Sequence, residues 1–361
     1  MIPYLLLPLI AGLLTFLSKS ATQHFSAARS TESKPVVIAS PGRFTPWDWL
    51  ALAALITFSG ARYMVGTDFA MYYRRFLALN PASWADELAV SPQEVGYTAL
   101  SLAIRSFTDE PALLFWIIAV LTVTPVYIVL HRFSQNLPLA ILLYILLAQY
   151  LIPLNLVRQG VAISFVFFAV AFLSSSKWKF FLGATIAILF HASAILILAV
   201  MIFSRDVRPT AKKIGVLVAI ATLGAIAVLQ IDFFAQMASL LNPRYETYLV
   251  ENRAGLGTYF VIGAKLALAL VVVWIINRTS HVERFSFFMP LSVAFLILGT
   301  ASIPLARLEY YFGIFAALVI PNVLSRLRNP APLTLAICLA SSAFFVFWLL
   351  NYGGLLPYRW E

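Results

Sequence analysis

The chain has 361 residues, of which 61% are hydrophobic and only 11% are charged, and its mean hydropathy is +0.90. Water-soluble domains carry charge on about a quarter of their residues, so this composition excludes one and predicts a protein that crosses a membrane many times. The net charge of +10 comes from Lys and Arg residues in the loops between the predicted spans. It gives no support to a nucleic-acid partner.

Long apolar runs predict the membrane spans in chain order. They lack the alternation of apolar and polar residues that barrel strands need, so helices are favoured. The predicted spans are residues 2–17, 47–61, 111–130, 137–153, 156–174, 214–230, 257–277, 286–300, 308–323 and 332–350. Together with the run described next, they predict an all-α polytopic protein with about 11–12 transmembrane helices and a single integral membrane domain over residues 1–361.

A further apolar run, residues 178–203, is interrupted at His191 and Ser193 and has basic residues on both flanks. Both of its ends should therefore lie on the same side of the membrane. Two pieces of about 12 residues reach about 18 Å each, which is short of a bilayer core of about 30 Å. The run predicts two short helices or a re-entrant pair, with His191 at the turn and facing a cavity open to the outside.

Lys and Arg are unevenly divided between the two sets of loops, fifteen against nine. Basic residues accumulate in cytoplasmic loops, which predicts that loop 18–46 is cytoplasmic and that loops 62–110 and 231–256 are extracytoplasmic. The outer loops contain amphipathic stretches at 69–76 and 235–250 that suit helices lying at the membrane interface.

With this topology, the unusual polar residues share the extracytoplasmic side. Polar residues are common in any loop, so position alone assigns no role to them. The residues concerned are Arg62, Asp68, Tyr72, Glu94, Arg158, Gln159, His191, Arg307 and Tyr310.

Two of the arginines are predicted near helix starts. Asn155 is expected to cap a helix with Arg158 in its first turn, and Ser302 marks a helix start shortly before Arg307. A helix N-terminus is already partly positive, so two such sites on one membrane face predict a binding site for a multiply charged anion such as a diphosphate. The alternative is snorkelling to lipid headgroups, or an ion pair of Arg307 with Glu309.

Asp68 and Glu94 are the candidate carboxylates for acid/base chemistry, with Asp68 preferred because the preceding glycine permits a close approach of backbone to ligand. Thr67 is expected to cap the helix that follows. Asp68 would then lie in the first turn, where its only role could be to stabilise the helix dipole. Lys265 lies within a predicted span and should face the bundle interior, as a structural partner or as part of a site.

Several kinds of chemistry have no support in the sequence. It contains one cysteine, Cys338, and no pattern with metal-ligand spacing, so no metal site is predicted. It has no Gly-rich phosphate loop, and no cofactor is predicted.

Six short strings, in order along nearly the whole chain, resemble the EpsG family of Wzy-like exopolysaccharide polymerases. They are Arg62-Tyr-Met-Val-Gly-Thr-Asp-Phe-Ala-Met-Tyr72, Glu94-Val-Gly-Tyr97, Val157-Arg-Gln-Gly160, Phe190-His-Ala-Ser193, Arg307-Leu-Glu-Tyr310 and Pro357-Tyr-Arg. The chain departs from the family pattern at Val95, where proline is expected, and at Phe69, where tyrosine is more usual. Both departures leave the polar groups intact.

The resemblance implies a glycosyltransferase of GT-C-like architecture in the bacterial inner (cytoplasmic) membrane, with its active site facing outside. Its donor and acceptor would be undecaprenyl-diphosphate-linked oligosaccharide repeat units, with membrane lipid around it and a chain-length regulator and a flippase as possible pathway partners. The expected roles are diphosphate binding for Arg158, Arg307 and Arg62, catalysis for Asp68, Glu94 and His191, and sugar contact for Gln159, Tyr72 and Tyr310.

Two other functions fit part of the pattern. A flippase or transporter of lipid-linked oligosaccharides should place cationic groups along its whole path, whereas here they gather at one end, with Lys265 as the exception. A polysaccharide O-acyltransferase needs a histidine in a tunnel connected to the cytosol, whereas His191 is predicted to open outward.

Overall fold

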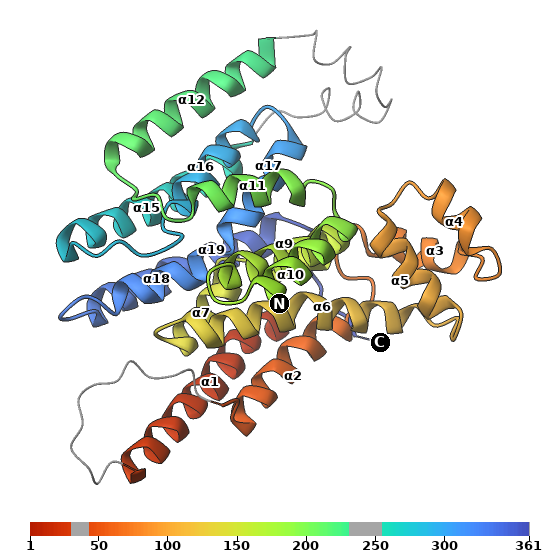
Figure 1. Cartoon of the computed structure of the whole chain (residues 1–361), viewed down its shortest axis with the longest axis horizontal. Helices are drawn as coiled ribbons and strands as arrows, with labels where there is room; N and C mark the ends of the chain where they lie inside the picture. The colour runs from red at the N-terminus through yellow and green to blue at the C-terminus, as the bar shows by residue number, and fades with distance from the viewer. Residues whose placement is uncertain (30–42, 231–254, 361) are drawn as a thin grey trace. The chain divides into compact units, whose positions relative to one another are not determined.

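The structure is a computed structural model, and it describes residues 1–29, 43–230 and 255–360 (Figure 1). Its regular elements are all helices, and the one β-bridge among the described residues joins Arg62 to Trp360. The predicted all-α fold is confirmed. The chain divides into two compact units, Met1–Leu198 with Pro332–Glu361, and Ala199–Ala331. The single membrane domain stays a prediction.

The first unit is built around α9, which is buried at every residue except Arg158 and Phe168. A helix that is apolar on all sides belongs inside a bundle, and α9 packs against both α6 and α10. The helices of this unit are α1 (Ile2–Arg29), α2 (Pro46–Gly60), α3 (Phe69–Ala78), α4 (Trp84–Val90), α5 (Val95–Arg105), α6 (Pro111–Phe133), α7 (Leu137–Leu146), η1 (Gln149–Leu151), α8 (Ile152–Asn155), α9 (Val157–Phe172), α10 (Lys177–Phe190) and nearly all of α19 (Ala331–Asn351).

In the second unit, α16 packs against α12, α15 and α17. Every residue of α18 is buried. The helices are α12 (Ala211–Gln230), α15 (Leu256–Thr279), α16 (Phe288–Leu298), α17 (Ile303–Gly313) and α18 (Ala316–Leu324), while α11 (Ala194–Ser204) contains the boundary between the units.

The described residues contain five helices that are long and apolar enough to cross a membrane, or six if a pair bent by 60° is one span. The chain is thus a multi-pass membrane protein. The five are Ile2–Ser20, Pro111–Phe133, Leu256–Thr279, Ile303–Leu324 and Ala331–Asn351. The other predicted runs are also helical, most of them in shorter or bent pieces, so the predicted number of crossings stays a prediction.

Two predictions about local structure are confirmed. The run at 178–203 forms two short helices, α10 and α11, and His191 lies at the break in an extended conformation with φ −160° and ψ 118°. The stretch at 69–76 is helical within α3 and buries one face, Phe69, Tyr72 and Phe76. The stretch at 235–250 lies outside the described residues.

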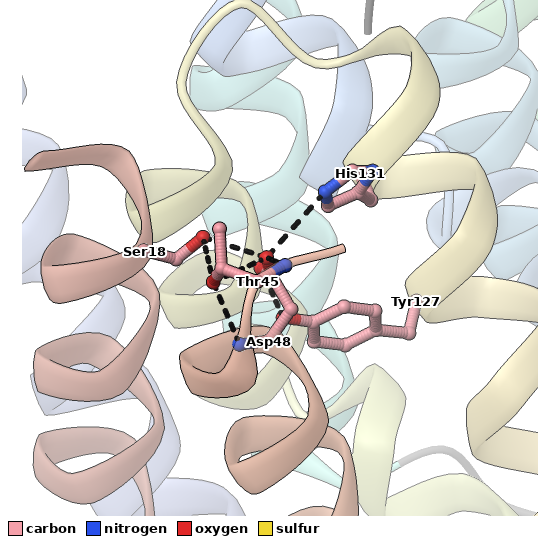
Figure 2. A network of polar contacts seen from close by, with 5 residues as sticks. All are labelled: Ser18, Thr45, Asp48, Tyr127 and His131. Atoms are coloured by element: carbon pink, nitrogen blue, oxygen red, sulfur yellow. Dashed lines mark hydrogen bonds and ion pairs between the residues drawn. The ribbon is translucent and has the colours of Figure 1, made fainter. Parts of the chain in front are cut away.

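A buried carboxylate network, which the sequence reasoning missed, ties three helices of the first unit together (Figure 2). Asp48 is 0% exposed and forms a capping box with Thr45 at the start of α2. Its oxygens accept hydrogen bonds from the hydroxyls of Ser18 on α1, at 2.7 Å, and Tyr127 on α6, at 2.9 Å, and His131 Nε2 lies 3.7 Å away. The carboxylate therefore joins α1, α2 and α6.

Replacing Asp48 with alanine should destabilise the first unit. It leaves the buried Tyr127 hydroxyl without its acceptor and removes the acceptor of the Thr45 backbone N–H, and a buried polar group left unpaired costs about 1–3 kcal/mol. Thermal unfolding of the purified chain in detergent, followed by tryptophan fluorescence, measures the effect. Asp86→Ala is the control, since Asp86 is exposed on α4, and equal unfolding temperatures for the two variants would contradict the role given to the network.

Candidate functional site

Four residues that the sequence singled out separately meet in the first unit. We call Tyr72, Glu94, Arg158 and His191 the Glu94 cluster. One carboxylate oxygen of Glu94 pairs with Arg158 Nη1, and the other contacts Nδ1 of His191. The Tyr72 hydroxyl lies 3.5 Å from Nε of Arg158. A single carboxylate thus holds an arginine and a histidine at once.

The cluster forms where four helices begin or end. Glu94 occupies the N-cap position of α5, Arg158 is in the first turn of α9, His191 follows the last residue of α10, and Tyr72 lies on the buried face of α3. Gly96 lets α5 approach α10, because a Cβ at this position would lie 2.7 Å from the Leu189 carbonyl oxygen. This close contact brings Glu94 within reach of His191.

The electrostatics of the cluster keep its carboxylate charged. Burial by itself raises the pKa of Glu94, but the hydrogen bond with His191 and the positive charge of Arg158 outweigh it and hold the pKa below its ordinary value. The side chains of Arg158, Glu94 and His191 remain 25%, 19% and 29% exposed. The cluster therefore holds an ionised carboxylate at a partly exposed position.

Asp68 lies beside the cluster, close enough for its charge to act on the Tyr72 hydroxyl. Thr67 was expected to cap α3, and that prediction is wrong because Asp68 takes the N-cap position, without a side-chain capping bond. Thr67 is held elsewhere: its backbone N–H donates to Asn155 Oδ1 at 2.7 Å, and its hydroxyl donates to Asp68 Oδ1 at 3.1 Å.

Asn155 was expected to cap the helix of Arg158, and this prediction is also wrong. Asn155 ends α8, and Leu156 takes the N-cap position of α9. The Asn155 side chain instead packs against the turn at Gly66, whose φ is +96°. A Cβ at Gly66 would lie 2.6 Å from the Asn155 amide oxygen. The placement of Arg158 in the first turn is confirmed nonetheless.

Arg62 is packed inside the first unit, with 2% of its surface exposed. Its guanidinium donates to the Ser59 carbonyl and lies 5.1 Å from the ring centre of Phe115. Gln159, next to Arg158 on α9, is buried as well. The roles of Arg62 in diphosphate binding and of Gln159 in sugar contact stay predictions.

Residues 353–360 are hydrogen-bonded to the segment at 62–67. The sequence reasoning missed this contact. The Tyr63 N–H donates to the Arg359 carbonyl at 2.9 Å, and the N–H groups of Gly66 and Thr67 donate to the carbonyls of Gly354 and Gly353. The first and last strings of the family pattern are therefore neighbours joined by the bond from Tyr63 to Arg359, and Gly353 and Gly354 hold the turn before Asp68.

In the second unit, Arg307 and Tyr310 lie on α17, whose start at Ser302 is confirmed. The alternative in which Arg307 pairs with Glu309 gains no support: Glu309, 0% exposed, pairs with Lys265 of α15 and accepts a hydrogen bond of 2.7 Å from Ser292. Lys265 thus neutralises the buried Glu309 carboxylate. Whether Arg307 and Tyr310 share a site with Arg158 stays a prediction.

Among the residues that the structure describes, no group of three or more His, Cys, Asp or Glu side chains could hold a metal ion. The Glu94 cluster offers instead a guanidinium for anion binding and a carboxylate-oriented imidazole for proton transfer.

Comparison with known proteins agrees with the resemblance in the sequence. The model of the EpsG family matches residues 49–360, and this family is associated with polysaccharide polymerase and glycosyltransferase activity. The match includes every residue of the Glu94 cluster. No curated protein and no solved structure matches the chain. Because the family model covers far more than half of the sequence, the chain belongs to the EpsG family.

Proposed function

We propose that the chain is a polysaccharide polymerase that joins undecaprenyl-diphosphate-linked oligosaccharide repeat units on the outer face of the bacterial inner membrane. The observation that carries this proposal is the Glu94 cluster, in which one carboxylate holds both an arginine and a histidine at a partly exposed position. Family membership supports the class of activity.

The reaction breaks the bond between the donor sugar's anomeric carbon and the diphosphate oxygen. A hydroxyl of the acceptor attacks that carbon from the opposite face, and the diphosphate leaves with the bonding electron pair. Arg158 binds the diphosphate and stabilises the charge that develops on it, since a guanidinium fork matches two phosphate oxygens. The donor is already activated, so the step consumes no nucleotide.

His191 takes the proton of the attacking hydroxyl in this proposal. With Nδ1 hydrogen-bonded to Glu94, the Nε2 atom is the free proton acceptor, and the carboxylate stabilises the imidazolium that forms. The geometry favours the His191–Glu94 pair over Asp68, whose carboxylate accepts a hydrogen bond from the Thr67 hydroxyl. Asp68 stays a second candidate for the base.

Glu94 also neutralises Arg158 before substrate arrives. A bound diphosphate carries more charge than one carboxylate, so it competes with Glu94 for the guanidinium of Arg158. Glu94 then interacts with His191 alone. In this way, donor binding and base activation are coupled through one side chain. The remaining proposed roles are diphosphate binding by Arg62 and Arg307 and sugar contact by Tyr72, Gln159 and Tyr310.

Substitution of Arg158 by lysine tests the proposal. Lysine keeps the charge but loses the planar fork, so we expect most of the polymer to disappear. The measurement is the amount and length of polysaccharide from cells whose only copy of the chain carries Arg158→Lys. Arg74→Lys is the control, because Arg74 is exposed on α3 and its guanidinium donates to the Ala70 carbonyl of its own helix.

Near-normal polymer from a well-expressed Arg158→Lys variant would remove Arg158 from the site. Deletion of the whole chain separates the proposed polymerase from a flippase. Without a polymerase, single repeat units still appear outside the membrane, whereas without a flippase none reach the outer face.

A further inference from the structure

A pocket of about 280 Å³ lies where α6 and α9 end and α10 begins. Phe172 in its wall is the last residue of α9, whereas Arg158 of the Glu94 cluster is in the first turn. The fourteen residues between them span about 21 Å at 1.5 Å per residue. The pocket is therefore separate from the candidate site. The residues that characterise it are Phe44, His131, Arg132, Phe172, Ser176 and Lys179.

Two cations line this pocket. Lys179 Nζ lies 4.4 Å from the centre of the Phe172 ring, so a cation–π contact holds the ammonium against the wall. Arg132, in the last turn of α6, is the second cation. Within the part of the chain that the structure describes, neither of them takes part in an ion pair. Both charges are therefore available to a ligand.

His131 belongs both to the pocket wall and to the Asp48 network (Figure 2). Its Nε2 atom lies 3.7 Å from the Asp48 carboxylate, and its ring stacks on Phe44 with the ring centres 4.3 Å apart. Asp48 is 0% exposed and does not line the pocket. No other acidic side chain lines it either, so the charges of Arg132 and Lys179 select an anionic ligand.

Exposed tryptophans beside the pocket indicate that it lies at the depth of the membrane interface. Trp178, next to Lys179, is 64% exposed, and Trp49, which packs on Phe44 with ring centres 5.1 Å apart, is 60% exposed. Tryptophan is enriched at membrane–water interfaces. Basic pockets between transmembrane helices on the cytoplasmic side bind lipid headgroups, and the predicted topology puts Phe44, in loop 18–46, on that side.

We propose that this pocket binds the phosphate of an anionic phospholipid, with Arg132 and Lys179 as its cations. The volume lies just below the range of about 300–1,000 Å³ of ligand pockets, which suits a headgroup and not a whole lipid. Phe181 and Leu182 of α10 are exposed and apolar, as contact with acyl chains requires. The proposal does not depend on the polymerase function, since the pocket uses no residue of the Glu94 cluster.

Native mass spectrometry of the purified full-length chain in detergent, titrated with phosphatidylglycerol, tests the pocket. Arg132→Gln and Lys179→Gln should each weaken binding about fivefold, and the double variant about thirtyfold, which is the contribution of basic residues near an anionic headgroup. Lys177→Gln is the matched control and should leave the affinity unchanged. Lys177 is exposed on the same helix as Lys179, but it does not line the pocket.

Two further probes identify the source of the phosphate. Phosphatidylcholine has the same phosphate but no net charge, so it should bind more weakly than phosphatidylglycerol. Glycerol 1-phosphate has the phosphate without acyl chains and should not displace the lipid at the same concentration. Displacement by glycerol 1-phosphate would overturn the lipid as the ligand, and equal binding of the two lipids would overturn the pocket as an anion site.

Charge-conserving variants separate binding from packing. Lys179→Arg and Arg132→Lys should keep the affinity, and unfolding temperatures without added lipid should be the same for all variants. A loss of affinity in Lys179→Arg as large as in Lys179→Gln would assign the effect to packing on Phe172 and overturn the role of charge. Unchanged affinity in the double variant, or an equal loss in Lys177→Gln, would overturn the pocket itself.

Discussion

Replacing Glu94 with glutamine is expected to slow polymer formation about 10²- to 10⁴-fold, the range that a positioned acid/base group contributes. Glutamine keeps the size of the side chain but loses the negative charge that pairs with Arg158 and stabilises a protonated His191. The pKa of Glu94 is held below its ordinary value, so at neutral pH the substitution removes a full charge. The measurement is the rate of polymerisation by the purified chain from lipid-linked repeat units.

Glu110→Gln is the matched control, because Glu110 holds the equivalent N-cap position of α6, is exposed and makes no capping bond through its side chain. It should leave the rate unchanged. If Glu94→Gln retains more than about a tenth of the rate, the base assignment moves to Asp68, and Asp68→Asn then becomes the decisive variant.

The second large effect is on stability, in the second unit. Lys265→Met should cost about 3–5 kcal/mol of the free energy of unfolding, because it leaves the fully buried Glu309 carboxylate without its cation. Ser292 still donates one hydrogen bond to Glu309, but a neutral hydroxyl does not replace a charge. Reversible unfolding in detergent mixtures measures the loss.

A double variant, Lys265→Met with Glu309→Leu, should recover much of this loss, since replacing a whole buried ion pair by apolar residues is often neutral. Lys212→Met, at an exposed position on α12, should change little. A double variant as unstable as Lys265→Met alone would show that the cost comes from packing around the lysine and not from an unpaired charge.

The fold was largely predictable because apolar length and helical structure go together in a membrane. Every predicted run is helical, but hydropathy does not mark where a helix ends. The predicted first span stops at residue 17 because polar residues follow, yet α1 continues to Arg29. Within the run at 137–153, the chain breaks at Ala148, which adopts φ 60°; an alanine in an apolar run gives no sign of this.

The candidate site was predictable in its parts and not in its assembly. Arg158, Glu94 and His191 stood out as unusual polar residues, but their contact depends on the approach of α5 to α10 at Gly96, which no local pattern encodes. The capping rules predicted wrongly that Asn155 caps α9, because its side chain accepts a tertiary hydrogen bond from the Thr67 N–H. The Asp48 network was missed although Thr-x-x-Asp is readable as a capping box, since its other donors lie on α1 and α6.

The segment at 62–67 can complete its hydrogen bonds only after residues 353–360 have been synthesised. The turn that precedes Asp68 emerges from the ribosome early, but its hydrogen-bonding partners are synthesised almost three hundred residues later. Until those residues arrive, the N–H groups of Tyr63, Gly66 and Thr67 lack their acceptors. A nascent chain can therefore insert its early helices while the wall of the site beside Asp68 is still incomplete, so premature termination yields an inserted protein with an unfinished site.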